Sequence, residues 1–151
     1  MTKTNDLTNV ADALNIVLAD SFALYLKTKN FHWHISGPHF RDYHLLLDEQ
    51  ATQILASTDL IAERVRKISG TTLRSIGHIE RLSEIADNDK DNVDAQAMLK
   101  ELQADNQTLI AALKKAKGLA DGAKDNASSG VIDQWTDEAE RRVWFLREAL
   151  M

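Results

Sequence analysis

The sequence has no cysteine, one proline and six glycines among its 151 residues. Without cysteine the chain can form neither a disulfide framework nor a thiolate metal site, so any metal chemistry must use histidine and carboxylate side chains. Because proline and glycine are the strongest local helix breakers, their scarcity leaves long stretches uninterrupted. The length and the ordinary shares of hydrophobic (44%) and charged (27%) residues predict one domain spanning residues 1–151.

Two further absences concern location and partners. No apolar run approaches the length of a membrane span, and the polar start MTKTNDLTNV lacks the apolar core of a signal peptide. These features predict a cytoplasmic protein without membrane contact. The net charge is −5, residues 1–10 offer only Lys3, offset by Asp6, and no tail follows the last helical segment. Direct DNA binding is therefore predicted to be weak or absent.

Apolar residues recur every three or four positions, the spacing of an amphipathic helix, and no stretch alternates with period two. In one segment Leu47, Ile54, Ile61 and Ile68 are spaced by sevens. The predicted bundle helices cover about 8–35, 39–69, 90–119 and 128–150, and the long linker at about 70–89 suits a short extra helix. The pattern predicts an all-α fold, a four-helix bundle with this extra helix between its second and third helices.

The histidines are clustered. Four of the five lie within thirteen consecutive positions, namely His32, His34, His39 and His44. At about 100° per residue, His32 falls on the apolar side of the first predicted helix and is expected to be buried. His34 falls on the opposite side with Asp20 and Lys27, which is predicted to face water.

The second predicted helix carries four potential metal ligands in one band, away from its core stripe: His44, Asp48, Asp59 and Glu63. On a single helix such a band is usually a solvated polar face. Here Ala51, Leu55 and Ala62 are interleaved with the ligands, and a water-facing surface does not favour apolar residues. The mixed composition predicts a subunit interface.

The spacing within this band separates two pairs of ligands. His44 and Asp48 are one turn apart, as are Asp59 and Glu63, but the pairs are centred fifteen residues apart, roughly 22 Å along one helix. They can share an ion only if the helix packs antiparallel against its own copy across a two-fold axis, with His32 completing the first pair. Two imidazoles and three carboxylates suit Fe(II), Mn(II) or Zn(II). Structural histidines and ion-paired carboxylates are the alternative.

Residues 30–65, NFHWHISGPHFRDYHLLLDEQATQILASTDLIAERV, resemble the signature of the Dps family, the miniferritins that protect DNA in starved bacteria. The family pattern HW-x-x-x-G-x-x-F-x-x-x-H-x-x-x-D is matched from His32 to Asp48, and DLIAER follows at residues 59–64. The resemblance implies a ferritin-like bundle. It also implies one set of iron ligands, which are His32, His44, Asp48, Asp59 and Glu63.

The resemblance implies an activity and an assembly as well. A Dps protein is a hollow dodecamer that binds Fe(II) at two-fold interfaces, oxidises it preferentially with hydrogen peroxide and stores ferric mineral. Such a ferroxidase limits oxidative damage. Trp33 is implied to be a sacrificial electron donor, with an interface aromatic as the alternative. The competing functions are a nucleoid protein that coats DNA and a buffer that holds zinc or manganese without redox turnover.

Several positions remain open in this comparison. His34 stands where the family usually has asparagine, and His39 lies in a variable slot, so each either tunes metal entry or is neutral. Asp121, Asp125 and Asp133 are candidates for acidic three-fold pores, with helix capping and solvation as the alternative. A metal pair inside one bundle would need Glu-x-x-His motifs, and no histidine here has a glutamate three positions before it.

Overall fold

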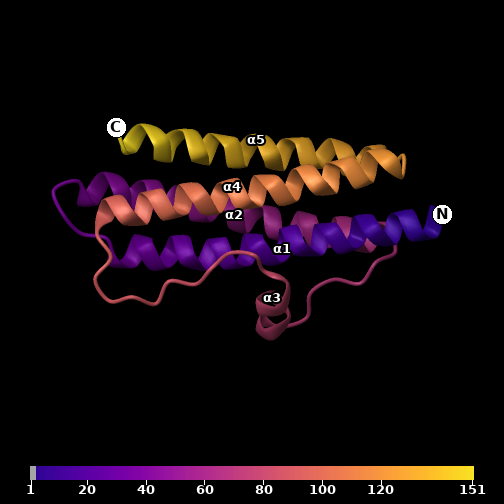
Figure 1. Ribbon diagram of the computed structural model, residues 1–151, viewed down its shortest axis with the longest axis horizontal. Coiled ribbons are helices and arrows are strands. Elements are labelled where there is room, and N and C mark those ends of the chain that lie inside the picture. Colours follow the sequence, from indigo (N-terminus) through magenta and orange to yellow (C-terminus); the bar gives the residue numbers. More distant parts are fainter. Residues whose placement is uncertain (1–2) are drawn as a thin grey trace.

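The computed structural model describes residues 3–151, with side chains from Asp6 onward, so the side chain of Lys3 lies outside the described part. Residues 3–151 form helices and contain no strand (Figure 1). The helices are α1 (Lys3–His34), α2 (Phe40–Lys67), α3 (Ile76–Leu82), α4 (Ala95–Gly122) and α5 (Asn126–Ala149). The predicted all-α fold, with a short extra helix between the second and third bundle helices, is confirmed.

The four long helices run side by side, and the short α3 lies across their flank (Figure 1). α1 and α2 are antiparallel, as are α4 and α5, whereas α2 and α4 run in the same direction. The linker after α2 must therefore return along the length of the bundle before α4 can begin. α1 packs against α2, α3 and α4, and α4 packs against α5. One long crossover of this kind is a known connection in four-helix bundles.

Local sequence decides where the helices begin and end. The Asp94 carboxylate accepts a hydrogen bond from the Ala97 amide at 2.8 Å, which caps α4 and starts it later than periodicity alone predicts. Gly37 adopts a φ of +119° in the turn between α1 and α2, a conformation that side chains oppose. Gly118 and Gly130 lie inside α4 and α5, each close to one end of its helix.

The core lies between the four long helices. Leu47, Ile54 and Ile61 are buried as their spacing predicts, but Ile68 follows the end of α2 and is only partly buried. Burying one such side chain contributes about 1.5–3 kcal/mol. Every long helix supplies fully buried side chains, among them Leu14, Leu18, Leu47, Ile54, Leu99, Leu102, Ile132 and Leu146.

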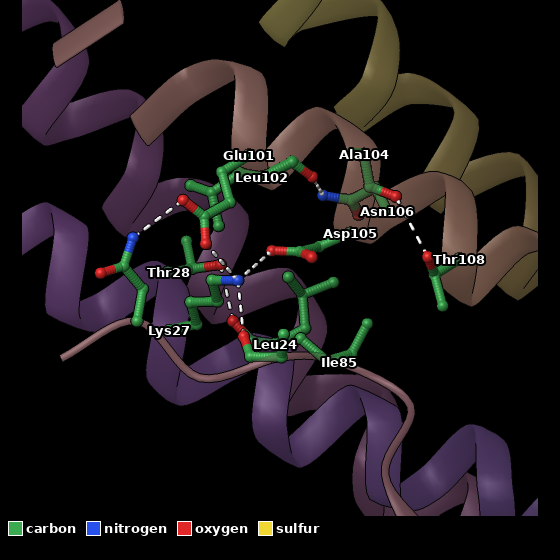
Figure 2. Close-up of polar contacts among 12 residues, drawn as sticks. Leu24, Lys27, Thr28, Ile85, Glu101, Leu102, Ala104, Asp105, Asn106 and Thr108 are labelled. Atoms are coloured by element: carbon green, nitrogen blue, oxygen red, sulfur yellow. Dashed lines mark hydrogen bonds and ion pairs between the residues drawn. The ribbon is translucent and has the colours of Figure 1, made fainter. Parts of the chain in front are cut away.

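The side of α1 that was predicted to face water is covered by the linker, so the prediction for Asp20 and Lys27 is wrong. Both side chains are buried. The Lys27 Nζ lies 2.8 Å from a carboxylate oxygen of Glu101 and 2.8 Å from one of Asp105, both on α4 (Figure 2). It also donates to the Ala86 carbonyl oxygen at 2.6 Å. One buried ammonium thus joins α1, α4 and the linker.

α1 is the one helix of the described residues that resembles a membrane span by length and composition. An 18-residue window within the segment Asp6–His34 has a mean hydropathy of 1.3, which meets the requirement for a membrane span by composition alone. However, 56% of that apolar window is buried inside the bundle, and the core helix of a soluble protein passes the same test. The apolar residues of α1, such as Leu14 and Leu18, belong to the core of the bundle.

Candidate metal centre

His32 near the end of α1 and His44 near the start of α2 lie face to face across the turn that joins the two helices. Their rings stack with centroids 3.9 Å apart and planes 14° from parallel. The Nδ1 of His32 is 2.7 Å from the carbonyl oxygen of His44, and the Nδ1 of His44 is 2.8 Å from the carbonyl oxygen of His32. A carbonyl oxygen can only accept, so each Nδ1 must carry the hydrogen. Each neutral ring then keeps the lone pair on Nε2, as metal binding requires.

Asp48 lies one turn after His44 on α2, and its Oδ1 is 3.8 Å from the Nε2 of His32. The same oxygen accepts a hydrogen bond from the Lys29 Nζ at 2.7 Å. That hydrogen bond, together with the positive charge of Lys29, holds the pKa of Asp48 below its usual value. Asp48 is therefore an ionised carboxylate beside the Nε2 of His32, and a carboxylate with an imidazole nitrogen is a suitable ligand group for a divalent cation.

Asp59 and Glu63 form a second group, one turn apart on α2 and both exposed. The hydrogen bond between their carboxyl groups and the negative charge of Asp59 raise the pKa of Glu63. Two carboxyl groups at this spacing repel each other when both are ionised, so a cation placed between them would relieve the repulsion. The pair is therefore suited to bind a cation by its own chemistry.

The two groups do not meet within one chain. They lie on the same straight helix with their centres fifteen residues apart, roughly 22 Å at the rise of an α-helix. Within the part of the chain that the structure describes, no cluster of three or more histidine, aspartate or glutamate side chains is arranged to hold a metal ion. The structure places His32 against His44 and within 3.8 Å of Asp48, without arranging the three to hold an ion, and leaves Asp59 and Glu63 apart from them.

The surface of α2 between the two groups is partly apolar. Leu55, midway along it, is 43% exposed, and Leu45 and Leu60 are exposed beside the groups. The prediction is corrected for Ala51, which is fully buried, while Ala62 is partly buried. Exposed leucines in line with carboxylates suit a surface that another helix covers.

Trp33 lies next to His32 in sequence but points into a different environment. It is 57% exposed and lines a groove of about 1420 Å³ between α1 and the segment 76–94. His34 is exposed, as predicted, and lines the same groove, with its Nδ1 2.8 Å from both the main-chain and the side-chain oxygen of Asn30. His39 is exposed at the turn, with its ring centroid 5.6 Å from that of Tyr43.

The three aspartates proposed for a pore have structural partners within the chain. The Asp125 carboxylate caps α5 by accepting from the amide and the hydroxyl of Ser128, at 3.2 and 2.6 Å. Asp121 accepts from the Ser129 hydroxyl at 2.6 Å. Asp133 pairs with the Lys117 Nζ at 2.9 Å. These contacts favour the capping alternative for Asp125.

The interior of the bundle contains a buried arginine. Arg142 on α5 is 4% exposed, and its Nε donates to the Asn106 side-chain oxygen at 2.8 Å. Its Nη1 donates to the Gln53 side-chain oxygen, also at 2.8 Å. Burial lowers the pKa of Arg142 to about 10, which leaves it charged at neutral pH. A guanidinium among amides repels a metal cation. The interior of the bundle is therefore unsuited to a metal pair, in agreement with the absence of Glu-x-x-His motifs.

Sequence reasoning missed Lys29. It lies three residues before His32 on α1, a spacing that places the two side chains on neighbouring positions of the helix surface. That spacing was the available signal, although the hydrogen bond to Asp48 depends on how α1 and α2 pack.

Known proteins resemble this chain over nearly its whole length. Residues 11–151 match the family described as ferritin-like domain. The DNA protection during starvation protein of Brevibacillus brevis is 32% identical over 142 residues, which are 93% of this chain and 94% of that protein. The crystal structure of a Dps protein from Bacillus brevis has a TM-score of 0.94 and 30% identity, and the match covers 100% of both chains.

A second solved structure adds a statement about chemistry. The Dps protein from Vibrio cholerae O1 is described as a member of a broad superfamily of ferritin-like diiron-carboxylate proteins. Its TM-score is 0.92 and its identity 26%, and the match covers 98% of this chain and 92% of that one.

Proposed function

Because this chain belongs to the Dps family of ferritin-like proteins, we propose that it is a ferroxidase that oxidises Fe(II) at sites shared between two copies of the chain and stores the ferric product. The observation that carries this proposal is the separation of the ligand groups. His32 at the end of α1 lies with His44 and Asp48 near the start of α2, whereas Asp59 and Glu63 lie toward the other end of α2.

Two copies of α2 that pack antiparallel about a two-fold axis would bring the unlike groups together twice. The three-residue group of each copy (His32, His44 and Asp48) would face the two-residue group of the other copy (Asp59 and Glu63). This gives two identical five-ligand sites. Leu55 would lie between the sites, where its exposed side chain becomes buried. This arrangement explains why α2 has ligands and leucines on one face.

The chemistry follows from the ligand set. The carboxylates stabilise Fe(III) more than Fe(II), so they make bound iron easier to oxidise. The substrates are two Fe(II) ions and one hydrogen peroxide. Each iron gives up one electron, the O–O bond breaks, two protons are taken up, and the products are two Fe(III) and two water molecules. Pairing two electrons with one peroxide avoids the release of hydroxyl radical.

The wider proposal is a hollow homododecamer in the cytoplasm that holds ferric mineral, formed from a single domain of residues 1–151. Trp33 is proposed as a sacrificial electron donor because it adjoins His32, and an interface aromatic is the alternative. Zinc or manganese storage would use the same ligands without redox turnover. The rise of ferric absorbance after Fe(II) and peroxide are added to the purified protein distinguishes a ferroxidase from such a buffer.

Complementation between two defective variants tests the shared site. One variant carries His44→Ala and Asp48→Ala, and the other carries Asp59→Ala and Glu63→Ala. Each variant alone is expected to lose rapid peroxide-driven iron oxidation, because every site lacks part of its ligands. In a mixed two-fold pair, one site lacks both sets and the other site is complete.

Co-assembly of the two variants should therefore restore rapid oxidation, to a fraction of wild type set by the share of mixed pairs. The share is measured by native mass spectrometry of the same sample. If mixed pairs are present and the sample remains inactive, the ligands are not shared between chains and the proposal is wrong. Activity of either variant alone would contradict it equally.

A further inference from the structure

The Lys29 side chain occupies a position that the proposed iron site does not explain. Its Nζ donates to the Asp48 Oδ1 at 2.7 Å, and this is the oxygen that lies 3.8 Å from the Nε2 of His32. The Lys29 side chain is 21% exposed, so it is partly shielded from water. A hydrogen bond between an ammonium and a carboxylate is among the stronger ones in proteins.

Lys29 and a divalent ion need the same atom. A metal bound to the His32 Nε2 and the Asp48 Oδ1 would have to share that oxygen with an ammonium in contact with it. The ion must then displace the ammonium, or bind Asp48 through the remaining lone pairs beside a positive charge. Both routes cost binding free energy.

We propose that Lys29 is an internal competitor of the metal ion for Asp48, and that it determines how tightly the three-residue half of the site binds metal. The inference rests on the proposed function, because it assumes that Asp48 is a metal ligand. Its consequence is a site that holds iron weakly enough to pass the ferric product on, instead of a site that stays filled. Lys29 acts through Asp48, so it is a positioning and affinity-determining residue.

The second half of the site supplies a matched control. Lys67 lies one turn after Glu63 on α2, and its positive charge acts to lower the pKa of Glu63. Lys67→Met removes one positive charge near the ligands, as Lys29→Met does, but it does not free the Asp48 Oδ1. The two variants therefore separate competition for one oxygen from a general effect of charge.

The test is titration of the full-length assembled protein with Co(II), followed by calorimetry and by the visible absorbance of the bound ion. Lys29→Met should bind Co(II) about tenfold or more tightly than wild type, since a hydrogen bond to a charged group has about this effect on an equilibrium. Lys67→Met should remain within about threefold of wild type, which is below the effect of one such hydrogen bond. Lys29→Arg, which keeps charge and donors, should show no gain.

Equal or weaker Co(II) binding by Lys29→Met would overturn the inference, because Lys29 would then support Asp48 as a ligand. An equal gain in both methionine variants would also overturn it, in favour of a general charge effect. If neither wild type nor Lys29→Met binds Co(II), the proposed function itself fails, and the inference fails with it. Lys29→Gln replaces Lys29→Met if the latter does not assemble.

Discussion

Asp20 provides the sharpest prediction about stability. Its carboxyl group lies in α1 beneath the linker and is fully buried. The Oδ1 accepts from the Glu84 amide at 2.6 Å and from the Ser83 hydroxyl at 3.3 Å, while the Oδ2 has no hydrogen-bond partner among the described residues. Burial raises the pKa of Asp20 from 3.8 to about 7. The folded protein therefore retains a proton that the unfolded chain releases near pH 4.

The sign of the pH dependence follows from this difference. Below about pH 4 both states are protonated, and the contribution of Asp20 to the free energy of unfolding is at its maximum. As the pH rises from 3.8 to about 7, unfolding releases a proton, so this contribution is lost progressively. A shift of about three pKa units corresponds to ~4 kcal/mol, which is the ceiling of the effect.

Asp20→Asn keeps an oxygen that accepts from the Glu84 amide but cannot ionise. Relative to the low-pH limit, we expect the variant to gain about 1 kcal/mol on wild type at pH 4.5 and up to ~4 kcal/mol at pH 8. The measurement is urea unfolding followed by circular dichroism at several pH values. Both proteins are compared at one concentration, because assembly couples stability to concentration.

Asp12→Asn, at an exposed position of the same helix, is the control for the loss of one negative charge from α1. A difference between Asp20→Asn and wild type that does not change between pH 4.5 and 8 would refute the reasoning. It would mean that Asp20 does not lose a proton in this range.

The remaining predictions concern assembly, DNA and helix capping. Sedimentation of the purified protein should give a mass many times the 16.9 kDa of one chain, and a monomer at micromolar concentration would exclude the shared site. Plasmid DNA should not be retarded in a gel at about 0.15 M salt, because an acidic assembly repels it; a salt-sensitive shift would contradict this. Asp125→Ala should destabilise the protein by about 1 kcal/mol through loss of the α5 cap, whereas Asp133→Asn should not. Slower iron uptake in both aspartate variants, measured at saturating peroxide, would favour the pore instead.

Periodicity predicted the helices and most of the core, but it did not predict correctly which side of every helix faces water. Leu47 and Ile61 are buried as expected, because a repeat of seven keeps them on one side of α2. Asp20 and Lys27 were assigned to water because a helical wheel distinguishes polar from apolar sides only. It contains no information about a linker that crosses the polar side and supplies hydrogen-bond partners there.

The sequence by itself determined the long helices, the histidine and carboxylate ligand types, and the separation of those ligands into two groups on one helix. These features depend on local spacing and on side-chain chemistry, both of which are present in the chain before it folds. Only the tertiary structure decided that His32 and His44 each direct Nδ1 to the other's carbonyl oxygen, that Lys29 holds Asp48, and that Arg142 occupies the interior. Each of these depends on distances of a few ångströms between different helices, which packing sets and sequence spacing does not contain.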